Sequence, residues 1–174
     1  MNSVDKYLGQ ALDSYPHWLE STIESLEFAL AHDENNTSAL CLYARVQSEQ
    51  FMNYDVAISY FQQALATDIN ALHIYPFFIK TLILNEDYKE AEKLIAFSLK
   101  LKGTNKVEIL FNRMKLLEIQ KEFKAAMEVL KEIQMLITDF EYNTDIEESE
   151  KRIKMKIKLA TSQKLKIKKL EASL

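Results

Sequence analysis

Tyr54-x-x-Ala57-x-x-x-Phe61 is the first of three similar segments that decide the fold of this chain. The other two are Tyr88-x-x-Ala91-x-x-x-Ile95 and Phe123-x-x-Ala126-x-x-x-Leu130, so the alanines are 34 and then 35 residues apart. An aromatic, a small and a large apolar residue at this spacing lie on one face of a helix. A unit of about 34 residues is too short to bury that face alone, so the pattern predicts units that stack on their neighbours.

The composition favours an all-α protein. The 174 residues include only two glycines and two prolines, and β-hairpin turn signals are missing. Long segments rich in Leu, Ala, Glu, Lys and Gln are typical of helices. We therefore predict a helical solenoid over residues 1–143, followed by a basic capping helix over residues 144–174.

Three helical hairpins are predicted over residues 38–139. They are expected to pair 38–50 with 54–66, 72–85 with 88–101, and 106–119 with 123–137. Two earlier helices, 5–12 and 16–31, form a degenerate pair, with Pro16 at the start of the second. Thr37 or Ser38 is expected to cap the next helix, and Gly103 suits a helix C-cap.

The last segment carries two competing signals. Thr144 and Glu147 form a capping-box pattern, and apolar residues recur every seven residues as a helix requires: Ile146, Ile153, Ala160, Ile167 and Leu174. Residues 153–159 alternate strictly between apolar and basic, as in a strand. We favour the helix, because the chain offers no second strand for pairing.

The charge is divided unevenly along the chain. Residues 1–150 hold 25 acids and 13 bases, whereas residues 151–174 hold nine bases and only Glu171. The basic segment could grip nucleic acid or an anionic membrane. The alternative, which we prefer, is that Ile153, Ile157, Ala160 and Ile167 dock on the last hairpin and the lysines stay in solvent.

Residues for catalysis or metal binding are not grouped in the sequence. Cys41 is the only cysteine and lies among apolar residues, which favours a small buried side chain over a reactive thiol. His17, His32 and His73 are scattered without metal-ligand spacing, and no glycine-rich phosphate loop is present. We predict a protein that is not an enzyme and uses no cofactor. Without a signal-peptide pattern or a long apolar stretch, we expect a cytoplasmic location.

The repeated motif resembles the second helix of the tetratricopeptide repeat (TPR). Residues 38–139 look like three such units, and the two earlier helices look like a fourth, degenerate one. The first-helix pattern of the family aligns poorly here, and its closing proline is replaced by Ile69, Gly103 and Thr138. The resemblance implies a right-handed solenoid of helical hairpins, closed by a long C-terminal helix.

In this family the first helices of the hairpins line a concave groove that holds a partner peptide or helix. One variant of the family binds the C-terminal carboxylate of its partner through a Lys and an Asn at set groove positions. This chain has Leu42 and Val46 at those positions, which argues against a heat-shock co-chaperone. By resemblance, the groove would be lined by Leu42, Val46, Glu49, His73, Phe77, Lys80, Ile83, Phe111, Lys115 and Glu118.

The leading functional hypothesis is a protein–protein interaction scaffold that binds a hydrophobic peptide or helix in this groove. A second is a chaperone like those that serve secreted translocator proteins, which are similar in layout. A third is a regulator that contacts nucleic acid or a membrane through residues 151–174. Self-association as a homo-oligomer is compatible with each of these.

Overall fold

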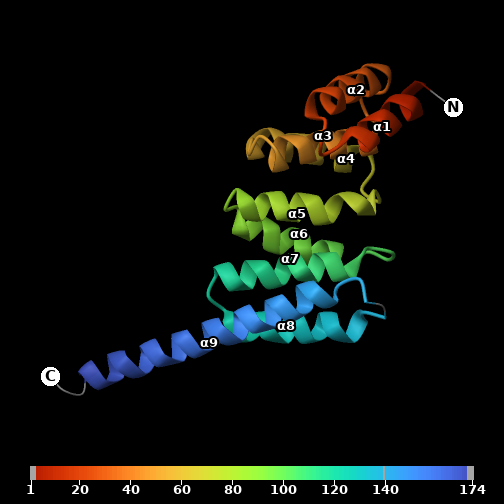
Figure 1. Cartoon of the computed structure of the whole chain (residues 1–174). Helices are drawn as coiled ribbons and strands as arrows, with labels where there is room; N and C mark the ends of the chain where they lie inside the picture. The colour runs from red at the N-terminus through yellow and green to blue at the C-terminus, as the bar shows by residue number, and fades with distance from the viewer. Residues whose placement is uncertain (1–2, 139, 172–174) are drawn as a thin grey trace. The chain divides into compact units, whose positions relative to one another are not determined.

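The computed structural model describes the backbone of residues 3–138 and 140–171, and side chains up to residue 163 (Figure 1). All regular structure in these residues is helical, which confirms an all-α protein. The alternating stretch 153–159 is helical as predicted. The elements are α1 (Ser3–Ser14), α2 (Leu19–His32), α3 (Thr37–Glu49), α4 (Tyr54–Thr67), the 3-10 turn η1 (Leu72–Ile74), α5 (Tyr75–Leu84), α6 (Tyr88–Ser98), α7 (Lys106–Ile119), α8 (Phe123–Leu136) and α9 (Asn143–Glu171).

The chain forms two compact units, Met1–Asn105 and Lys106–Leu174. The first unit holds α1 to α6, in which α1 pairs with α2, α3 with α4, and α5 with α6. The second unit holds the α7–α8 pair together with α9, which packs on α8. The C-terminal helix therefore belongs to the same compact unit as the third repeated hairpin.

The three signature alanines occupy equivalent places in the helices α4, α6 and α8. Ala57, Ala91 and Ala126 are each fully buried. The large apolar residue that follows each alanine is also buried, and the aromatic residue that precedes it is half-buried. The predicted helical face is thus confirmed in all three copies. A side chain limited to one methyl group lets a neighbouring helix approach closely at this position.

The turns inside the hairpins are also repeated. Met52, Glu86 and Lys121 have φ of 53°, 63° and 63°, and each lies two residues before the second helix of its hairpin. In the second hairpin, the amide of Asp87 donates to the carbonyl of Leu82 (2.9 Å) and that of Glu86 donates to Ile83 (3.2 Å). This is the Schellman arrangement, which gives hydrogen bonds to carbonyl groups that have no donor within the helix at its C-terminal end.

The third hairpin ends its first helix in the same way. The amide of Glu122 donates to the carbonyl of Leu117 (2.8 Å), and that of Lys121 donates to Glu118 (3.1 Å). Glycine is the usual residue at the left-handed position of such a turn, because a Cβ is strained there. The chain thus carries the same local strain at Glu86 and Lys121.

Several predicted helix ends are wrong. Asn36, not Thr37 or Ser38, caps α3, since its side-chain Oδ1 accepts from the amide of Ala39 at 3.0 Å. Pro16 lies in the turn before α2, which begins only at Leu19. Thr144 lies inside the first turn of α9 and not ahead of it.

Gly103 is not a helix C-cap, because α6 ends at Ser98 with Leu99 as its C-cap. Gly103 instead lies in the turn after α6 with φ of +90°, and a Cβ there would lie 3.3 Å from Leu72 Cδ1. The predicted helix over 72–85 begins as the 3-10 turn η1 and becomes α-helical at Tyr75.

Apolar side chains join α1, α2 and α3 at one end of the first unit. This core consists of Ala11, Leu26, Ala29, Ala39, Leu42 and Val46. Next to it, a hydroxyl pair ties α3 to α5, because Thr81 Oγ1 donates to Ser48 Oγ at 2.9 Å in a buried position. These contacts fix the relative positions of α1, α3 and α5, whose residues form the candidate site.

In the second unit, the proximal part of α9 is docked by apolar residues. Ile153 is fully buried and Ile146 nearly so. Ile157 and Ala160 are half-buried, and from Thr161 to Gln163 the side chains are exposed. Figure 1 shows α9 continuing past the end of α8. The predicted docking is confirmed for the first half of the helix, while Ile167 and Leu174 lie outside the described side chains.

Candidate partner-binding surface

The ten residues predicted to line a groove are divided between the two units. Unit Met1–Asn105 holds Leu42, Val46, Glu49, His73, Phe77, Lys80 and Ile83, and unit Lys106–Leu174 holds Phe111, Lys115 and Glu118. Each set is therefore described on its own.

Three of the predicted groove residues are buried in the core of the unit. Leu42, Val46 and Ile83 are 2%, 0% and 3% exposed. Leu42 and Val46 pack against Ala11 of α1, which covers this part of α3. In this structure their side chains present no surface to a partner.

Three others, Glu49, Phe77 and Lys80, meet in one cluster on α3 and α5. The cluster also contains Tyr15, from the turn after α1, and Arg45, one helical turn before Glu49. The Cζ atom of Arg45 lies 4.1 Å from the ring centroid of Phe77 and 5.0 Å from that of Tyr15. A guanidinium that contacts two rings is held by cation–π attraction and by apolar contact. We call these five residues the Arg45 cluster.

The carboxylate of Glu49 holds the cluster together. Lys80 Nζ donates to Glu49 Oε1 at 2.8 Å, the Tyr15 hydroxyl donates to Oε2, and Arg45 Nη2 lies 3.8 Å from Oε2. Burial alone would raise the pKa of Glu49, but the hydrogen bonds from Lys80 and Tyr15 outweigh it and the pKa lies below its usual value. The pKa of Tyr15 is raised, first by burial and then by its bond to Glu49. Glu49 is therefore ionised and Tyr15 protonated at neutral pH.

The Arg45 cluster is only partly closed. The side chain of Lys80 is 42% exposed and that of Arg45 is 24% exposed. Arg45 Nε is buried and has no hydrogen-bond partner among the described residues. Two cations face one carboxylate, so the cluster carries a net positive charge beside aromatic rings. Such a surface can receive a carboxylate and an adjoining apolar group.

His73 is exposed on η1, and no hydrogen bond or ion pair joins it to the Arg45 cluster among the described residues. In the second unit, Lys115 is exposed, whereas the Phe111 ring packs on Tyr142 at 5.6 Å between centroids. Glu118 is buried beneath α9. The sequence-predicted residues of this unit thus lie largely against the chain's own C-terminal segment.

Glu118 anchors α9. Arg152 donates to it from Nε (3.1 Å to Oε1) and from Nη2 (2.9 Å to Oε2), and Lys156 Nζ donates to Oε1 at 2.9 Å. Burial would raise the pKa of Glu118, but these hydrogen bonds outweigh burial and lower the pKa. Glu118 is thus an ionised anchor for the docked helix.

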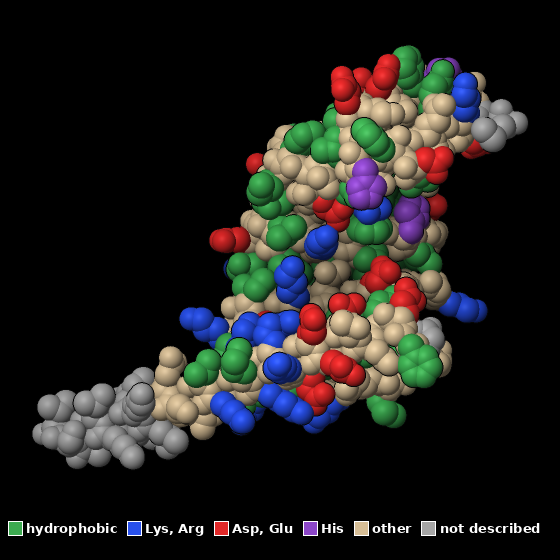
Figure 2. Space-filling model, viewed as in Figure 1, with side chains coloured by type: hydrophobic (Ala, Val, Ile, Leu, Met, Phe, Trp, Pro, Cys, Tyr) green, Lys and Arg blue, Asp and Glu red, His purple; other side chains and the backbone are tan. Residues whose placement is uncertain are grey.

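Most cations on the described part of α9 contact acids of the same unit. Arg152 and Lys156 pair with Glu118, and Lys154 pairs with Glu150 at 2.6 Å. Lys151 and Lys158 are exposed. Figure 2 shows basic and acidic side chains intermixed over the surface of this unit. The remaining lysines of the basic segment lie outside the described side chains.

The described side chains contain no group of three or more His, Cys, Asp or Glu that could hold a metal ion. Cys41 is buried, and burial raises the pKa of its thiol to about 12, so the thiol is unreactive at neutral pH. None of the helices, over the residues described, combines the length and the apolar character needed to cross a bilayer.

Comparison with known proteins adds no family to these observations. No protein-family model matches the chain, and no curated protein matches it.

Sequence reasoning missed Tyr15 and Arg45. Arg45 was detectable, because Arg45 and Glu49 are spaced to pair along one helix face. Tyr15 was not, since only the turn between α1 and α2 places its hydroxyl against Glu49.

Proposed function

We propose that this chain is a TPR-like scaffold that binds a segment of a partner protein at the Arg45 cluster. The observation that carries the proposal is the partly exposed Arg45 side chain, whose guanidinium contacts two aromatic rings, with Lys80 in the same cluster. This surface is built from α3 and α5, the first helices of two hairpins, which are the helices that line the ligand groove in the family.

Two further observations support the repeat assignment. The three hairpins share the buried alanine and the left-handed residue at equivalent positions. Glu49 and Glu118 lie two repeat lengths apart, and each accepts hydrogen bonds from the helix that follows its hairpin, α5 or α9. On this basis α9 takes the place of the first helix of a further unit, as a capping helix would.

The proposed ligand is a peptide segment with an apolar side chain and a nearby carboxylate. The apolar group would pack on Phe77, and the carboxylate would bind Lys80 and Arg45. This proposal is preferred to a regulator acting through the basic helix, because three of the five cations between residues 151 and 163 are already paired within the chain.

The test is capture of partners from the native cell extract by the parent and by three variants. Phe77→Ala and Lys80→Ala should each lose the proteins captured by the parent, while Lys131→Ala, an exposed lysine of α8, should retain them. Circular dichroism checks that each variant stays helical. Partners that survive both substitutions in the cluster would refute the proposed site.

A further inference from the structure

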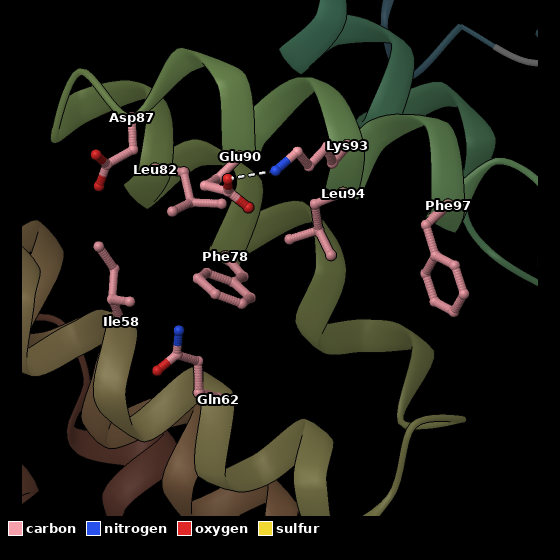
Figure 3. Close-up of a pocket in the computed structure, with 9 residues that line it drawn as sticks. All are labelled: Ile58, Gln62, Phe78, Leu82, Asp87, Glu90, Lys93, Leu94 and Phe97. Atoms are coloured by element: carbon pink, nitrogen blue, oxygen red, sulfur yellow. Dashed lines mark hydrogen bonds and ion pairs between the residues drawn. The ribbon is translucent and has the colours of Figure 1, made fainter.

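A cleft of about 440 Å³ lies in the first unit between α4, α5 and α6 (Figure 3). It is formed by different side chains from those of the Arg45 cluster. Its walls are apolar, and polar side chains stand at its rim. The lining residues are Ile58, Gln62, Phe78, Leu82, Asp87, Glu90, Lys93, Leu94 and Phe97.

The two aromatic side chains that line the cleft pack against other aromatic rings, which hold them in place. Phe78 stacks on the fully buried ring of Phe61 at 5.3 Å between centroids. Phe97 contacts the ring of Tyr75 at 6.0 Å, and the Tyr75 hydroxyl donates to the carbonyl of Ile69 at 2.7 Å. A binding site whose walls are already ordered loses little entropy when it is occupied.

Phe97 gives the cleft an open apolar surface. Its side chain is 40% exposed, although Phe78 and Leu82 at the floor are nearly buried. Figure 3 shows Ile58 and Gln62 of α4 facing Phe78, with Leu94 and Phe97 of α6 along the other side. The volume is sufficient for one large apolar side chain with part of its backbone.

The rim has an excess of negative charge. Asp87 and Glu90 contribute two carboxylates from the beginning of α6, and Lys93 contributes one ammonium. Lys93 Nζ donates to Glu90 at 2.7 Å, and Asp87 accepts from the side-chain amide of Asn85 at 2.8 Å. Both carboxylates keep further acceptor positions, so a ligand cation can be received at this rim.

We propose that this cleft is a second docking site, for a protein segment that carries a large apolar anchor beside Lys or Arg. The anchor enters between Phe78, Leu94 and Phe97, and the cation lies against Asp87 and Glu90. The charge preference is opposite to that of the Arg45 cluster, so the two surfaces select different segments. The inference does not depend on the proposed function of that cluster.

Three peptides, each acetylated and amidated, test the chemistry of the cleft: Ala-Lys-Phe-Lys-Ala, Ala-Glu-Phe-Glu-Ala and Ala-Lys-Ala-Lys-Ala. Each is titrated into the ¹⁵N-labelled full chain at low salt, and amide shifts are followed by NMR. The Lys-Phe-Lys peptide should shift amides of α4 and α6 around Gln62, Leu94 and Phe97. It should bind roughly two- to fivefold more tightly than the Glu-Phe-Glu peptide, the range expected for exposed ion pairs. The peptide without the phenyl group should give no saturable shifts there.

Two variants assign the contacts. Glu90→Gln should remove most of the preference for the lysine peptide, and Phe97→Ala should weaken both phenylalanine peptides. Glu132→Gln, an exposed acid of α8, is the matched control and should change neither result. Equal or tighter binding of the Glu-Phe-Glu peptide, shifts that lie elsewhere, or a preference that survives Glu90→Gln would overturn the proposal. If the peptides instead shift the amides around Arg45, the docking site is the Arg45 cluster and not the cleft.

Discussion

Replacing Glu118 by glutamine should release α9 from the second unit. The substitution keeps the volume of the side chain but removes the charge that accepts hydrogen bonds from Arg152 and Lys156. The Glu118 side chain is only 6% exposed, so its carboxylate is ionised in a largely dry position. The side-chain NH2 group of glutamine is a hydrogen-bond donor, and Arg152 and Lys156 also offer only donors. This group therefore cannot form a hydrogen bond with either cation.

The size of the effect follows from the exposure of the partners. A hydrogen bond to a charged group contributes about 1.5–3 kcal/mol. Arg152 and Lys156 are 42% and 37% exposed, so both can return to water and recover part of the loss. We therefore expect the docking of α9 to weaken by about 1–2 kcal/mol, which corresponds to a roughly 5- to 30-fold larger open population.

Hydrogen exchange measured by mass spectrometry reports this opening by segment. In Glu118→Gln, exchange should accelerate by roughly that factor in peptides covering residues 143–160, and little in α4 or α6. The matched control is Glu150→Gln, which removes the exposed pair with Lys154 on the same helix and should cost at most about 0.5 kcal/mol. If both variants accelerate exchange equally, Glu118 is not the anchor of α9 and the reasoning is refuted.

Three other predictions concern the repeated hairpins and the effect of pH. Glu86→Gly and Lys121→Gly should each raise the free energy of unfolding by about 0.5–1 kcal/mol, because glycine relieves the left-handed strain; a lower urea midpoint would contradict this. Ala91→Leu should lower that free energy by about 1–3 kcal/mol through overpacking, and a variant as stable as the parent would show that the Ala91 site has room for a larger side chain. The folded-state pKa of Glu118 is lowered, so its contribution to stability is present above about pH 4.5 and lost as the pH falls through the folded pKa. The urea midpoint of the parent should therefore fall more between pH 6 and pH 3.5 than that of Glu118→Gln, and equal falls would contradict this coupling.

The sequence predicted the helices well because their main signal is local. The spacing of Ala57, Ala91 and Ala126 reports a buried face within one helix, and all three alanines are buried. The helix ends were less predictable. Gly103 was predicted as a helix C-cap because glycine is the usual residue at a left-handed position. Inside the hairpins this position is taken by Glu86 and Lys121, and neither residue type indicates such a turn in the sequence.

The candidate site was predicted only in part, because burial by another helix is not encoded locally. Leu42 and Val46 have the composition expected of an apolar groove, but α1 covers them. Glu118 was expected to line the groove and instead anchors α9, since the sequence does not show which acid Arg152 will contact. Within the first unit, Glu49, Phe77 and Lys80 do meet, yet the residue that links them is Arg45.

Photo-crosslinking from position 77 tests the central claim most directly. The chain is produced with benzoylphenylalanine in place of Phe77, or in place of the exposed Met135 of α8 as a control, and is irradiated in the native cell extract. If the Arg45 cluster binds a partner segment, position 77 should give a discrete protein adduct that is lost when Lys80→Ala is added, and position 135 should not give it. An adduct formed equally from both positions, or one at position 77 that persists with Lys80→Ala, would contradict binding at this cluster.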